Sequence, residues 1–311
     1  MVDIRAKLFI VSGLLVCVTS LTCIITLCSC QALRTKYVLF VALSVGDLIN
    51  GLSVALAGLF RDIYLYTGKY YVSGTGLDCL FGAPWPIPLI IAGQFPALIN
   101  VSILLERLVA LHAVVWYRKS PNFKFGLVIA SILLTAIFTG LGIIATAAAK
   151  TTHTDRMCTM IGTTGVLFGT VHYSLIAITY LMCFIGLMFT YKQLNAKRTP
   201  RCDERHRQRM TITLSGIGVV LVSIPNVMIT ANEWKAIEVP ALVTGIAYSL
   251  YAIHSGLSFF VYITFRADFR QRFLELIGIQ DGCFPSKSKI AHAGSVPRSG
   301  VATTTIIVKG S

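Results

Sequence analysis

The amino-acid sequence predicts an all-α fold, a seven-transmembrane helix bundle followed by a short amphipathic eighth helix. Three observations lead to this prediction: an apolar composition, seven long runs almost free of charge, and an alternation of basic and less basic loops. Apolar residues make up 55% of the 311 residues and charged residues only 13%, and the mean hydropathy is +0.74. A soluble domain carries about 25% charged residues because its surface faces water. The chain therefore has too little polar surface for a soluble protein.

Seven runs are long enough to cross a bilayer as helices. A helix needs about 20 residues to span the hydrocarbon layer, and lipid forces its backbone groups to bond internally. The runs are Leu8–Cys30, Tyr37–Phe60, Cys79–Leu111, Phe125–Ala149, Ile161–Tyr191, Met210–Asn232 and Val239–Phe265. The second run contains one charged residue, Asp47, and the third contains Glu106 and Arg107.

Lysine and arginine divide unevenly between alternate loops. With Arg107 set aside, nineteen basic residues lie in the segments that follow the first, third, fifth and seventh runs. Only seven basic residues lie before the first run or in the segments that follow the second, fourth and sixth runs. Positive residues are retained on the cytoplasmic side of a membrane. We therefore expect a multi-pass protein of the plasma membrane, with its amino terminus extracellular and its carboxyl terminus cytoplasmic. The same clustering at membrane edges argues against nucleic acid as a partner, despite a net charge of +14.

This topology divides the chain into four segments. Residues 1–7 form a short extracellular amino terminus, residues 8–265 the membrane domain, residues 266–283 an amphipathic helical region and residues 284–311 a disordered cytoplasmic tail. In the third segment, Phe269 and Phe273 share one helical face of Ala267–Ile277, so that stretch is expected to lie in the inner membrane interface. The tail is rich in Ser, Thr, Gly and Lys and has too little apolar surface to fold.

Asp47 lies in the middle of the second run, where a charged group is costly and needs a reason. In one interpretation the buried carboxylate binds a cation or changes its protonation as the helices rearrange. In the other it accepts hydrogen bonds from neighbours such as Ser44, or from a hydroxyl group on another helix. The sequence leaves both interpretations open.

Two features of the third and sixth runs suggest a conformational switch. Glu106 and Arg107 lie at the cytoplasmic end of the third run. They either mark the helix boundary, or Glu106 holds Arg107 in a resting state and releases it to a cytoplasmic partner. Pro225 interrupts the sixth run. Because proline removes a backbone hydrogen bond, it predicts a bend about which the inner half of that helix can pivot.

The nine cysteines do not form a disulfide framework. Five lie within apolar runs, where cysteine behaves as a small hydrophobic residue. Cys79 and Cys158 both lie on the outer side, where an oxidising environment favours a disulfide between them. Cys283 follows the amphipathic segment and is either a palmitoylation site or a plain free thiol.

These motifs, in this order, resemble those of rhodopsin-like G-protein-coupled receptors from about Leu33 to Phe273. LSVGD, ending at Asp47, is similar to the second-helix LxxxD motif, and ERL from Glu106 is similar to the D/E-R-Y motif. The most specific part is SFFVYITFRADFRQRF, in which Tyr262 precedes an FR pair by the spacing of the family's junction between helices seven and eight. The FFVY sequence and the LRTK sequence most resemble the nematode serpentine chemoreceptors, class SX in particular.

The resemblance implies a receptor that binds a ligand from outside and signals to a heterotrimeric G protein. It places the ligand pocket among the third, fifth, sixth and seventh helices, with the candidate residues Leu89, Gln94, His172 and Tyr248. The alternative role of the polar residues among them is a hydrogen bond between helices. The residues expected to switch or to meet the G protein are Glu106, Arg107, Tyr191, Pro225 and Tyr262. Because Leu89 stands at the level where aminergic receptors carry an aspartate, a small odorant-like molecule is expected rather than an amine.

Other functions remain open. A neuropeptide receptor of the same fold is one, although the segment before Leu8 offers peptides little surface. A seven-helix transporter or channel would need polar residues along a path through several helices, and five of the seven runs contain no charged residue. A scaffold for trafficking is also open, since Ser258-Phe259 replaces the usual Asn-Pro. No enzyme, cofactor or metal is expected, because the sequence shows no nucleophile–base set or metal-ligand cluster.

Overall fold

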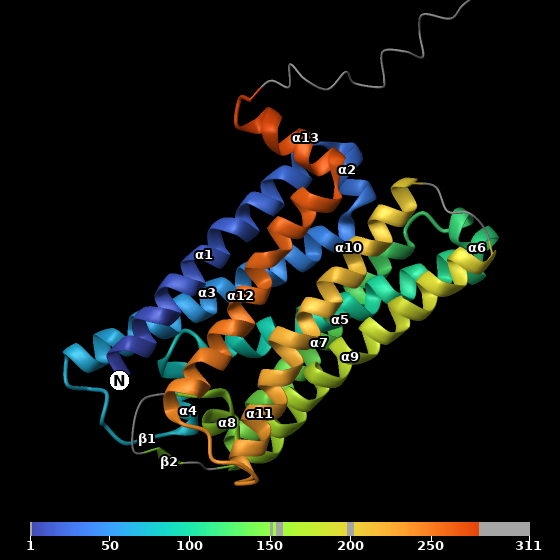
Figure 1. Cartoon of the computed structure of the whole chain (residues 1–311). Coiled ribbons are helices and arrows are strands. Elements are labelled where there is room, and N and C mark those ends of the chain that lie inside the picture. The colour runs from blue at the N-terminus through green and yellow to red at the C-terminus, as the bar shows by residue number, and fades with distance from the viewer. Residues whose placement is uncertain (1, 150–151, 154–157, 198–201, 280–311) are drawn as a thin grey trace, which may run out of the picture.

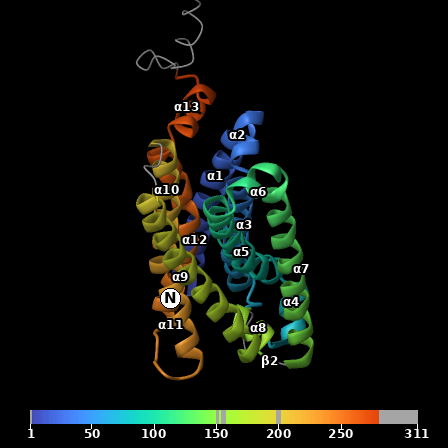
Figure 2. The ribbon, with the colours of Figure 1, turned by 90° about the vertical axis from the view of Figure 1, so that its right-hand side faces the viewer.

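The computed structural model describes residues 2–149, 152–153, 158–197 and 202–279. Within them, seven helices are long and apolar enough to cross a membrane. The helices run alongside one another in a single bundle, seen from two sides in Figures 1 and 2. The predicted all-α seven-helix bundle is therefore confirmed, and the protein is a multi-pass membrane protein.

The spanning helices are α1 (Val2–Cys28), α3 (Val38–Tyr66), α5 (Pro86–His112), α7 (Phe123–Ala149), α9 (Val166–Lys197), α12 (Ala241–Phe265) and a combined helix. The combined helix consists of α10 (Cys202–Gly218), the π-helical turn η1 (Val219–Ser223) and α11 (Ile224–Glu233). The shorter elements are α2 (Gln31–Lys36), β1 (Gly74–Thr75), α4 (Gly76–Gly82), α6 (Val114–Lys119), β2 (Thr152–His153), α8 (Met160–Thr164) and α13 (Ala267–Leu276). The two strands form an antiparallel ribbon, with Gly74 opposite His153.

The third apolar run forms two helices, so the prediction that Cys79 begins the spanning helix is wrong. Cys79 lies in α4, and the spanning helix α5 begins at Pro86. A residue that precedes a proline is forced toward extended backbone, and Ala83, before Pro84, has φ −117° and ψ 137°. Proline is favoured in the first turn of a helix, where its missing N–H is not needed. The prolines therefore end α4 and start α5.

The fifth apolar run is also divided, at Gly165. The φ angle of Gly165 is +86°, which a residue with a side chain rarely adopts. This residue separates the short helix α8 from the spanning helix α9. The spanning helix then continues to Lys197, beyond the predicted end at Tyr191.

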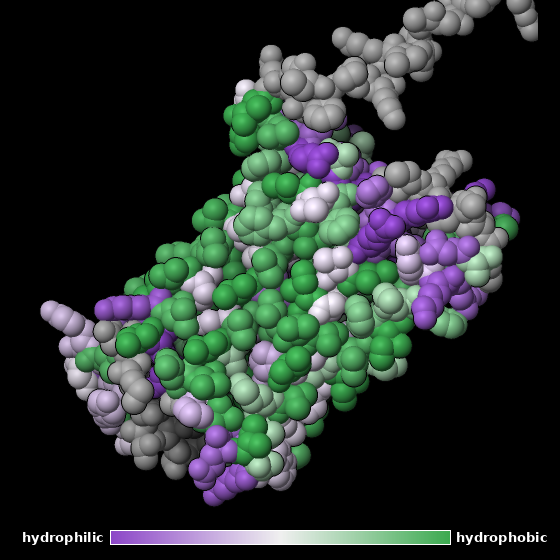
Figure 3. Space-filling model, in the orientation of Figure 1, coloured by the Kyte–Doolittle hydropathy of each residue, from purple (hydrophilic) through white to green (hydrophobic). Residues whose placement is uncertain are grey.

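The surface of the bundle reverses the pattern of a soluble protein. Figure 3 shows apolar residues over the middle of the visible face and polar residues gathered toward the two ends. In α7, Ile132 and Ile137 are exposed, whereas Ser131 and Thr135 are buried. Ser131 Oγ lies 3.0 Å from Ser102 Oγ of α5. The apolar face of α7 is thus directed toward lipid and its polar face toward the bundle.

The largest buried apolar cluster lies at the end of the bundle that carries α2 and α13. It includes Ile99, Ile103, Leu214, Tyr262 and Phe269. Within it, the ring centroids of Tyr262 and Phe269 are 5.6 Å apart, so α13 is packed against α12. The helix α13 covers the segment predicted to be amphipathic, and its position on a membrane surface stays a prediction.

Helices α1 and α3 approach closely because glycines line their interface. A Cβ atom on Gly51 would lie 2.9 Å from the backbone nitrogen of Cys17, and one on Gly58 would lie 2.6 Å from the carbonyl oxygen of Ala6. In lipid, the hydrophobic effect does not drive helices together. Small residues let two membrane helices approach closely, and the resulting van der Waals packing holds them together instead.

Gly58→Leu should therefore separate α1 from α3 and destabilise the bundle by about 1–3 kcal/mol or more, the usual cost of overpacking. The melting temperature of the purified full-length protein in detergent measures this effect. Gly140→Leu in α7 is the matched control, because a Cβ atom at Gly140 meets nothing within 4 Å. Equal melting temperatures for the two variants would contradict the prediction.

Candidate functional site

The predicted disulfide between Cys79 and Cys158 is present, with an S–S distance of 2.04 Å. It joins α4 to the segment that precedes α8, and Trp85 Nε1 donates to the carbonyl oxygen of Cys158 at 3.3 Å. Thr159 and Met160, the next two residues, line a cavity inside the bundle. The disulfide thus fixes part of the cavity wall, and we name this end of the bundle the disulfide end.

The cavity has a volume of about 60 Å³. Its wall contains residues of α1, α3, α5, α8, α9, α11 and α12. Three of the four predicted pocket residues, Leu89, His172 and Tyr248, line it, and so do Arg61 and Asn226, which the sequence did not single out. A mostly apolar cavity with a few convergent polar groups is typical of a small-molecule site.

Gln94, the fourth predicted pocket residue, lies behind the cavity wall. Its Nε2 atom is 2.9 Å from Nδ1 of His172, and both side chains are buried. An amide nitrogen only donates, so Nδ1 accepts and the imidazole carries its proton on Nε2. A Cβ atom on Gly93 would lie 2.7 Å from that Nε2 atom. Gln94 and Gly93 together therefore determine how the His172 ring is placed.

Tyrosine hydroxyls connect three of the helices around the cavity. The hydroxyl oxygens of Tyr173 in α9 and Tyr248 in α12 lie 3.0 Å apart. Tyr251 of α12 donates to the carbonyl oxygen of Ala92 in α5 at 2.8 Å. Buried hydroxyls nearly always need such partners. The bonds therefore fix α5, α9 and α12 relative to one another around the cavity.

Arg61 contributes a positive charge to the cavity wall. The sequence placed it in a loop, but α3 extends to Tyr66, which carries Arg61 into the bundle, where it is 7% exposed. Its guanidinium carbon lies 5.3 Å from the ring centroid of Phe9 and 5.6 Å from that of Trp85. The negative faces of aromatic rings attract a cation. These two rings therefore hold the guanidinium at the wall.

The combined helix changes its helical type directly beside the cavity. The π-helical turn η1 ends at Ser223, and α11 continues with Pro225 in its first turn. Ser223 Oγ donates to the carbonyl oxygen of Ala177 in α9 at 2.9 Å. Asn226, which follows Pro225, lines the cavity. A π-turn, a feature often found at functional sites, thus lies just before Pro225, and the bend itself stays a prediction.

Asp47 lies in a buried polar seam between α3 and α12. Ser258 Oγ donates to Asp47 Oδ2 at 3.1 Å, so a hydroxyl on another helix does reach this carboxylate. Asn50 Nδ2 donates to Ser255 Oγ at 3.0 Å, whereas Asn50 Oδ1 and the Tyr262 hydroxyl have no hydrogen-bond partner among the described residues. Among all the residues that the structure describes, no three His, Cys, Asp or Glu side chains are grouped so as to hold a metal ion.

Glu106 is clamped by donors from three elements at the opposite end of α5. Arg107 Nε lies 3.3 Å from Oε2, and Lys124 Nζ of α7 lies 3.4 Å from Oε1. Tyr117 of α6 donates its hydroxyl to Oε1 at 2.6 Å. Burial, followed by the hydrogen bond to the carboxylate, raises the pKa of Tyr117, so the tyrosine remains a donor. Glu106 and Arg107 are only 2% and 6% exposed. Two charged residues that only marked the end of a helix would not need to be buried.

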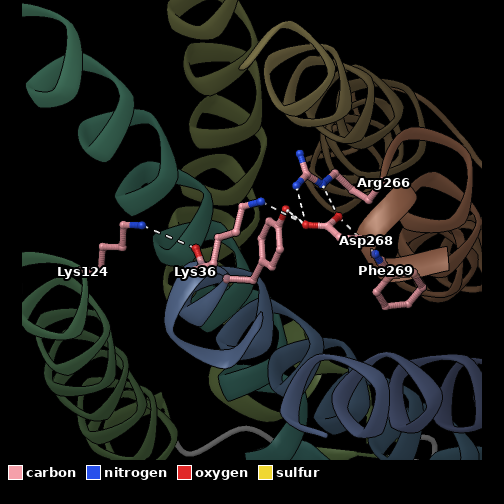
Figure 4. Close-up of polar contacts among 6 residues, drawn as sticks. Lys36, Lys124, Arg266, Asp268 and Phe269 are labelled. Carbon is pink, nitrogen blue, oxygen red and sulfur yellow. Dashed lines mark hydrogen bonds and ion pairs between the residues drawn. The ribbon is translucent and has the colours of Figure 1, made fainter. Parts of the chain in front are cut away.

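A second polar cluster ties α13 to α2 and is drawn in Figure 4. Asp268 accepts hydrogen bonds from Lys36 Nζ at 3.0 Å and from the Tyr37 hydroxyl at 2.8 Å. Arg266 donates to the two carboxylate oxygens at 3.1 and 2.9 Å, and its guanidinium lies 4.8 Å from the Tyr37 ring centroid. Lys124 Nζ is 3.5 Å from the carbonyl oxygen of Lys36. This lysine therefore connects the cluster to the clamp around the buried glutamate.

The other predicted coupling residues are spread over two helices. Tyr262 of α12 packs between Phe40 of α3 and Phe269 of α13, with ring centroids at 5.8 and 5.6 Å. Tyr191 lies on α9 within reach of Arg209 of α10. Cys283 and the tail lie outside the described residues. The structure thus brings Glu106 and Arg107 into direct contact, whereas Tyr191 and Tyr262 belong to separate clusters.

Comparison with known proteins finds no matching protein-family model and no matching curated protein. The class of protein is therefore defined by the chain's own fold and site. It is a multi-pass, seven-helix membrane protein with a small cavity at the disulfide end and a buried Glu–Arg pair at the opposite end.

Cys79→Ser and Cys158→Ser should destabilise the protein equally, by about 2–5 kcal/mol. The double variant should be no worse than either single variant, because each change breaks the same bond. The melting temperature of the purified protein and the fraction of tagged protein at the cell surface measure the effect. Cys28→Ser, which alters a free thiol, is the control. Additive losses would show that the two cysteines act separately.

Proposed function

We propose that the protein is a rhodopsin-like G-protein-coupled receptor of the plasma membrane, with a chemosensory role and a small organic ligand. One observation carries the proposal: a single bundle holds a cavity at the disulfide end and the buried Glu106–Arg107 pair at the opposite end. Between the two, the combined helix contains the π-turn η1 and Pro225. These are the three parts that a ligand-operated switch needs: an input, an output and a hinge.

Ligand contacts at the hinge can be transmitted to the opposite end. Asn226 and Ile229 of α11 line the cavity immediately beyond η1. A ligand shifts a conformational balance only by binding one state more tightly than the other. In our proposal the favoured state has α10 swung outward about η1 and Pro225. A heterotrimeric G protein then contacts Arg107 and the basic loop that precedes α10.

The clamp around Glu106 makes the release of Arg107 less costly. Removing one member of a buried ion pair normally leaves an uncompensated charge. Glu106 keeps two further donors, Lys124 and Tyr117, when Arg107 leaves. The carboxylate therefore remains neutralised in both states, which supports a switching role for ERL although Leu108 replaces the family's tyrosine.

The proposed orientation places the disulfide end outside the cell and the Glu106–Arg107 end inside. An oxidising exterior suits the disulfide, and the nineteen basic residues that follow the first, third, fifth and seventh apolar runs in the sequence suit the cytoplasmic side. In this orientation α13 lies at the inner face. Its exposed Leu276 and the adjacent Ile277 would then meet lipid.

A ligand screen in cells tests the proposal. The full-length chain is expressed and exposed to a panel of small organic compounds, with cyclic-nucleotide and calcium readouts. At least one compound should produce a signal that is absent from untransfected cells. Solute movement into vesicles that contain the purified protein, without activation of any G protein, would instead favour a transporter.

Arg107→Ala should reduce the signal of an active compound at least tenfold, because the variant removes a charged contact to the G protein. The amount of protein at the cell surface should be unchanged. Arg118→Ala, which removes an exposed basic residue of α6 at the same end, is the matched control and should signal nearly normally. Full signalling by Arg107→Ala would leave Glu106–Arg107 as a structural pair only.

Epitope tags at the two ends of the chain should be accessible from opposite sides of the membrane, because seven spans place the termini on opposite sides. In unpermeabilised cells an antibody should label only the amino-terminal tag, and permeabilisation should reveal the other. Labelling of only the carboxyl-terminal tag would reverse the proposed orientation. Labelling of both tags would contradict the odd number of spans.

A further inference from the structure

Asn226 brings an unpaired amide to the cavity. The side chain is 4% exposed and lines the cavity wall. Thr230 donates to its backbone carbonyl oxygen, but the side-chain nitrogen Nδ2 has no hydrogen-bond partner in the described chain. A buried donor without a partner is costly, because its bonds to water have been lost. An acceptor atom on a bound molecule would remove that cost.

The tyrosine pair in the same wall supplies a second donor. Tyr173 and Tyr248 line the cavity, and their hydroxyl oxygens lie 3.0 Å apart. Each hydroxyl carries one proton, and the bond between the two oxygens uses only one of them. The hydroxyl that accepts keeps its own proton, for which no described residue supplies an acceptor. Both tyrosines belong to one packed cluster with Ile229, which lies about one helical turn from Asn226 on the same face of α11.

The wall offers a ligand no free charge. Acidic side chains are absent from it as far as the structure describes it, so an ammonium group would lose its water without gaining a counter-charge. Arg61 is the only charged residue of the described wall, but it has a further interaction within the protein besides the rings of Phe9 and Trp85. A carboxylate would therefore have to displace an existing contact. Burying an uncompensated charge is far more costly than burying a neutral polar group, so the wall favours an uncharged ligand.

From these groups we infer that the cavity binds a small uncharged carbonyl compound, a ketone or an ester on a compact apolar frame. A carbonyl oxygen has two acceptor lone pairs and no proton of its own. It can therefore take one hydrogen bond from Asn226 and one from the tyrosine pair, while apolar side chains such as Ile176 and Ile229 enclose the carbon frame. The inference rests on the proposed function, since it names the ligand class of the same cavity. The volume of about 60 Å³ limits the frame to a few carbon atoms or a single small ring.

The two donors also connect such a ligand to the hinge. Asn226 follows Pro225 directly in α11, whereas Tyr173 and Tyr248 belong to α9 and α12. No described hydrogen bond holds the Asn226 amide, so it can turn toward the ligand about its broad last torsion. A carbonyl group bound by both donors bridges α11 to the neighbouring helices. It therefore favours the arrangement of η1 that brings the amide to the cavity, and this differential binding is what a population shift requires.

Binding is measured on the purified full-length protein in detergent, as a shift of the melting temperature in sealed samples, so that the result does not depend on a G protein. The probes are 2-butanone, methyl acetate and cyclopentanone, at concentrations up to the millimolar range. The charged counterparts are sec-butylamine, cyclopentylamine and butanoate. At least one carbonyl compound should raise the melting temperature in a dose-dependent way. The charged counterparts should need at least about tenfold higher concentrations, because each would bury a charge.

Asn226→Leu tests the first donor, since leucine has nearly the shape of asparagine but cannot donate. It should weaken binding of the carbonyl compounds about three- to tenfold, the effect of one neutral hydrogen bond. Binding of 2-methyl-1-butene and methylenecyclopentane, hydrocarbons with the shapes of 2-butanone and cyclopentanone, should not be weakened. Without a ligand, Asn226→Leu should melt at the same temperature as the unaltered chain or higher, because an unpaired buried amide gives way to an apolar group.

Tyr173→Phe combined with Tyr248→Phe tests the second donor. This double variant should weaken carbonyl binding by a similar factor, and Asn226→Leu carries the test alone if the double variant does not fold. Thr139→Val is the control, because it also removes a hydroxyl. Thr139 lies outside the cavity wall and donates to the carbonyl oxygen of Thr135 within α7, so its variant should bind the carbonyl compounds normally.

Any of four results would overturn the inference. They are the absence of a shift with every carbonyl compound, stronger binding of the charged counterparts, undiminished carbonyl binding in Asn226→Leu or in the folded tyrosine double variant, and a melting temperature of Asn226→Leu well below that of the unaltered chain. The proposed function fails separately. Carbonyl binding without G-protein activation in cells would retain the site and reject the receptor. Activation by amines or carboxylates alone would retain the receptor and reject the carbonyl site.

Discussion

The structure depends on one constraint: in a bilayer, polar side chains must find partners inside the protein because no water reaches them. Lipid is as apolar as leucine, so apolar contact alone does not select which helices meet. The buried polar pairs do select them. Gln94–His172 joins α5 to α9, Tyr173–Tyr248 joins α9 to α12, and Ser258–Asp47 joins α12 to α3. The interior is thus organised by inter-helix hydrogen bonds, and the close glycine packing of α1 and α3 supplies the remaining contacts.

Not every buried polar group meets this constraint, and two donors are examples. Asn226 Nδ2 at the cavity and the Tyr262 hydroxyl in the seam near Asp47 are buried donors without partners in the described chain. Each reduces stability unless another state or a bound molecule supplies an acceptor. The first faces the cavity beside Pro225, and the second packs against α13. One unpartnered donor thus lies at the cavity and the other beside α13.

The sequence was sufficient for the number of helices and for the disulfide, because length, charge and side of the membrane determine them. It was insufficient where local backbone chemistry overrides hydropathy. Pro84 and Pro86 divided one apolar run, and the positive φ of Gly165 divided another. Arg61 was assigned to a loop because charge was taken to end a helix, although the apolar residues after it continue the helical pattern. Gln94 was predicted to line the pocket, but the structure shows that it faces His172 behind the cavity wall.

Two helices carry both a residue of the cavity and a proline, yet only one of them suits movement. In α5, Asn100 Nδ2 donates to the carbonyl oxygen of Pro96 at 3.0 Å, and a Cβ atom on Gly46 would lie 2.9 Å from the ring of Pro96. That proline is therefore locked against α3. The combined helix instead exposes Val220 and Ile224 toward lipid around its π-turn. A π-turn holds one residue more than an α-helical turn, so converting it would rotate α10 against α11 by about 100°. Such a rotation would move Leu214 of α10 within the buried cluster that it shares with Ile99 and Ile103 of α5, while the turn at Pro96 stays fixed. The proposed hinge therefore fits the helix whose π-turn contacts lipid.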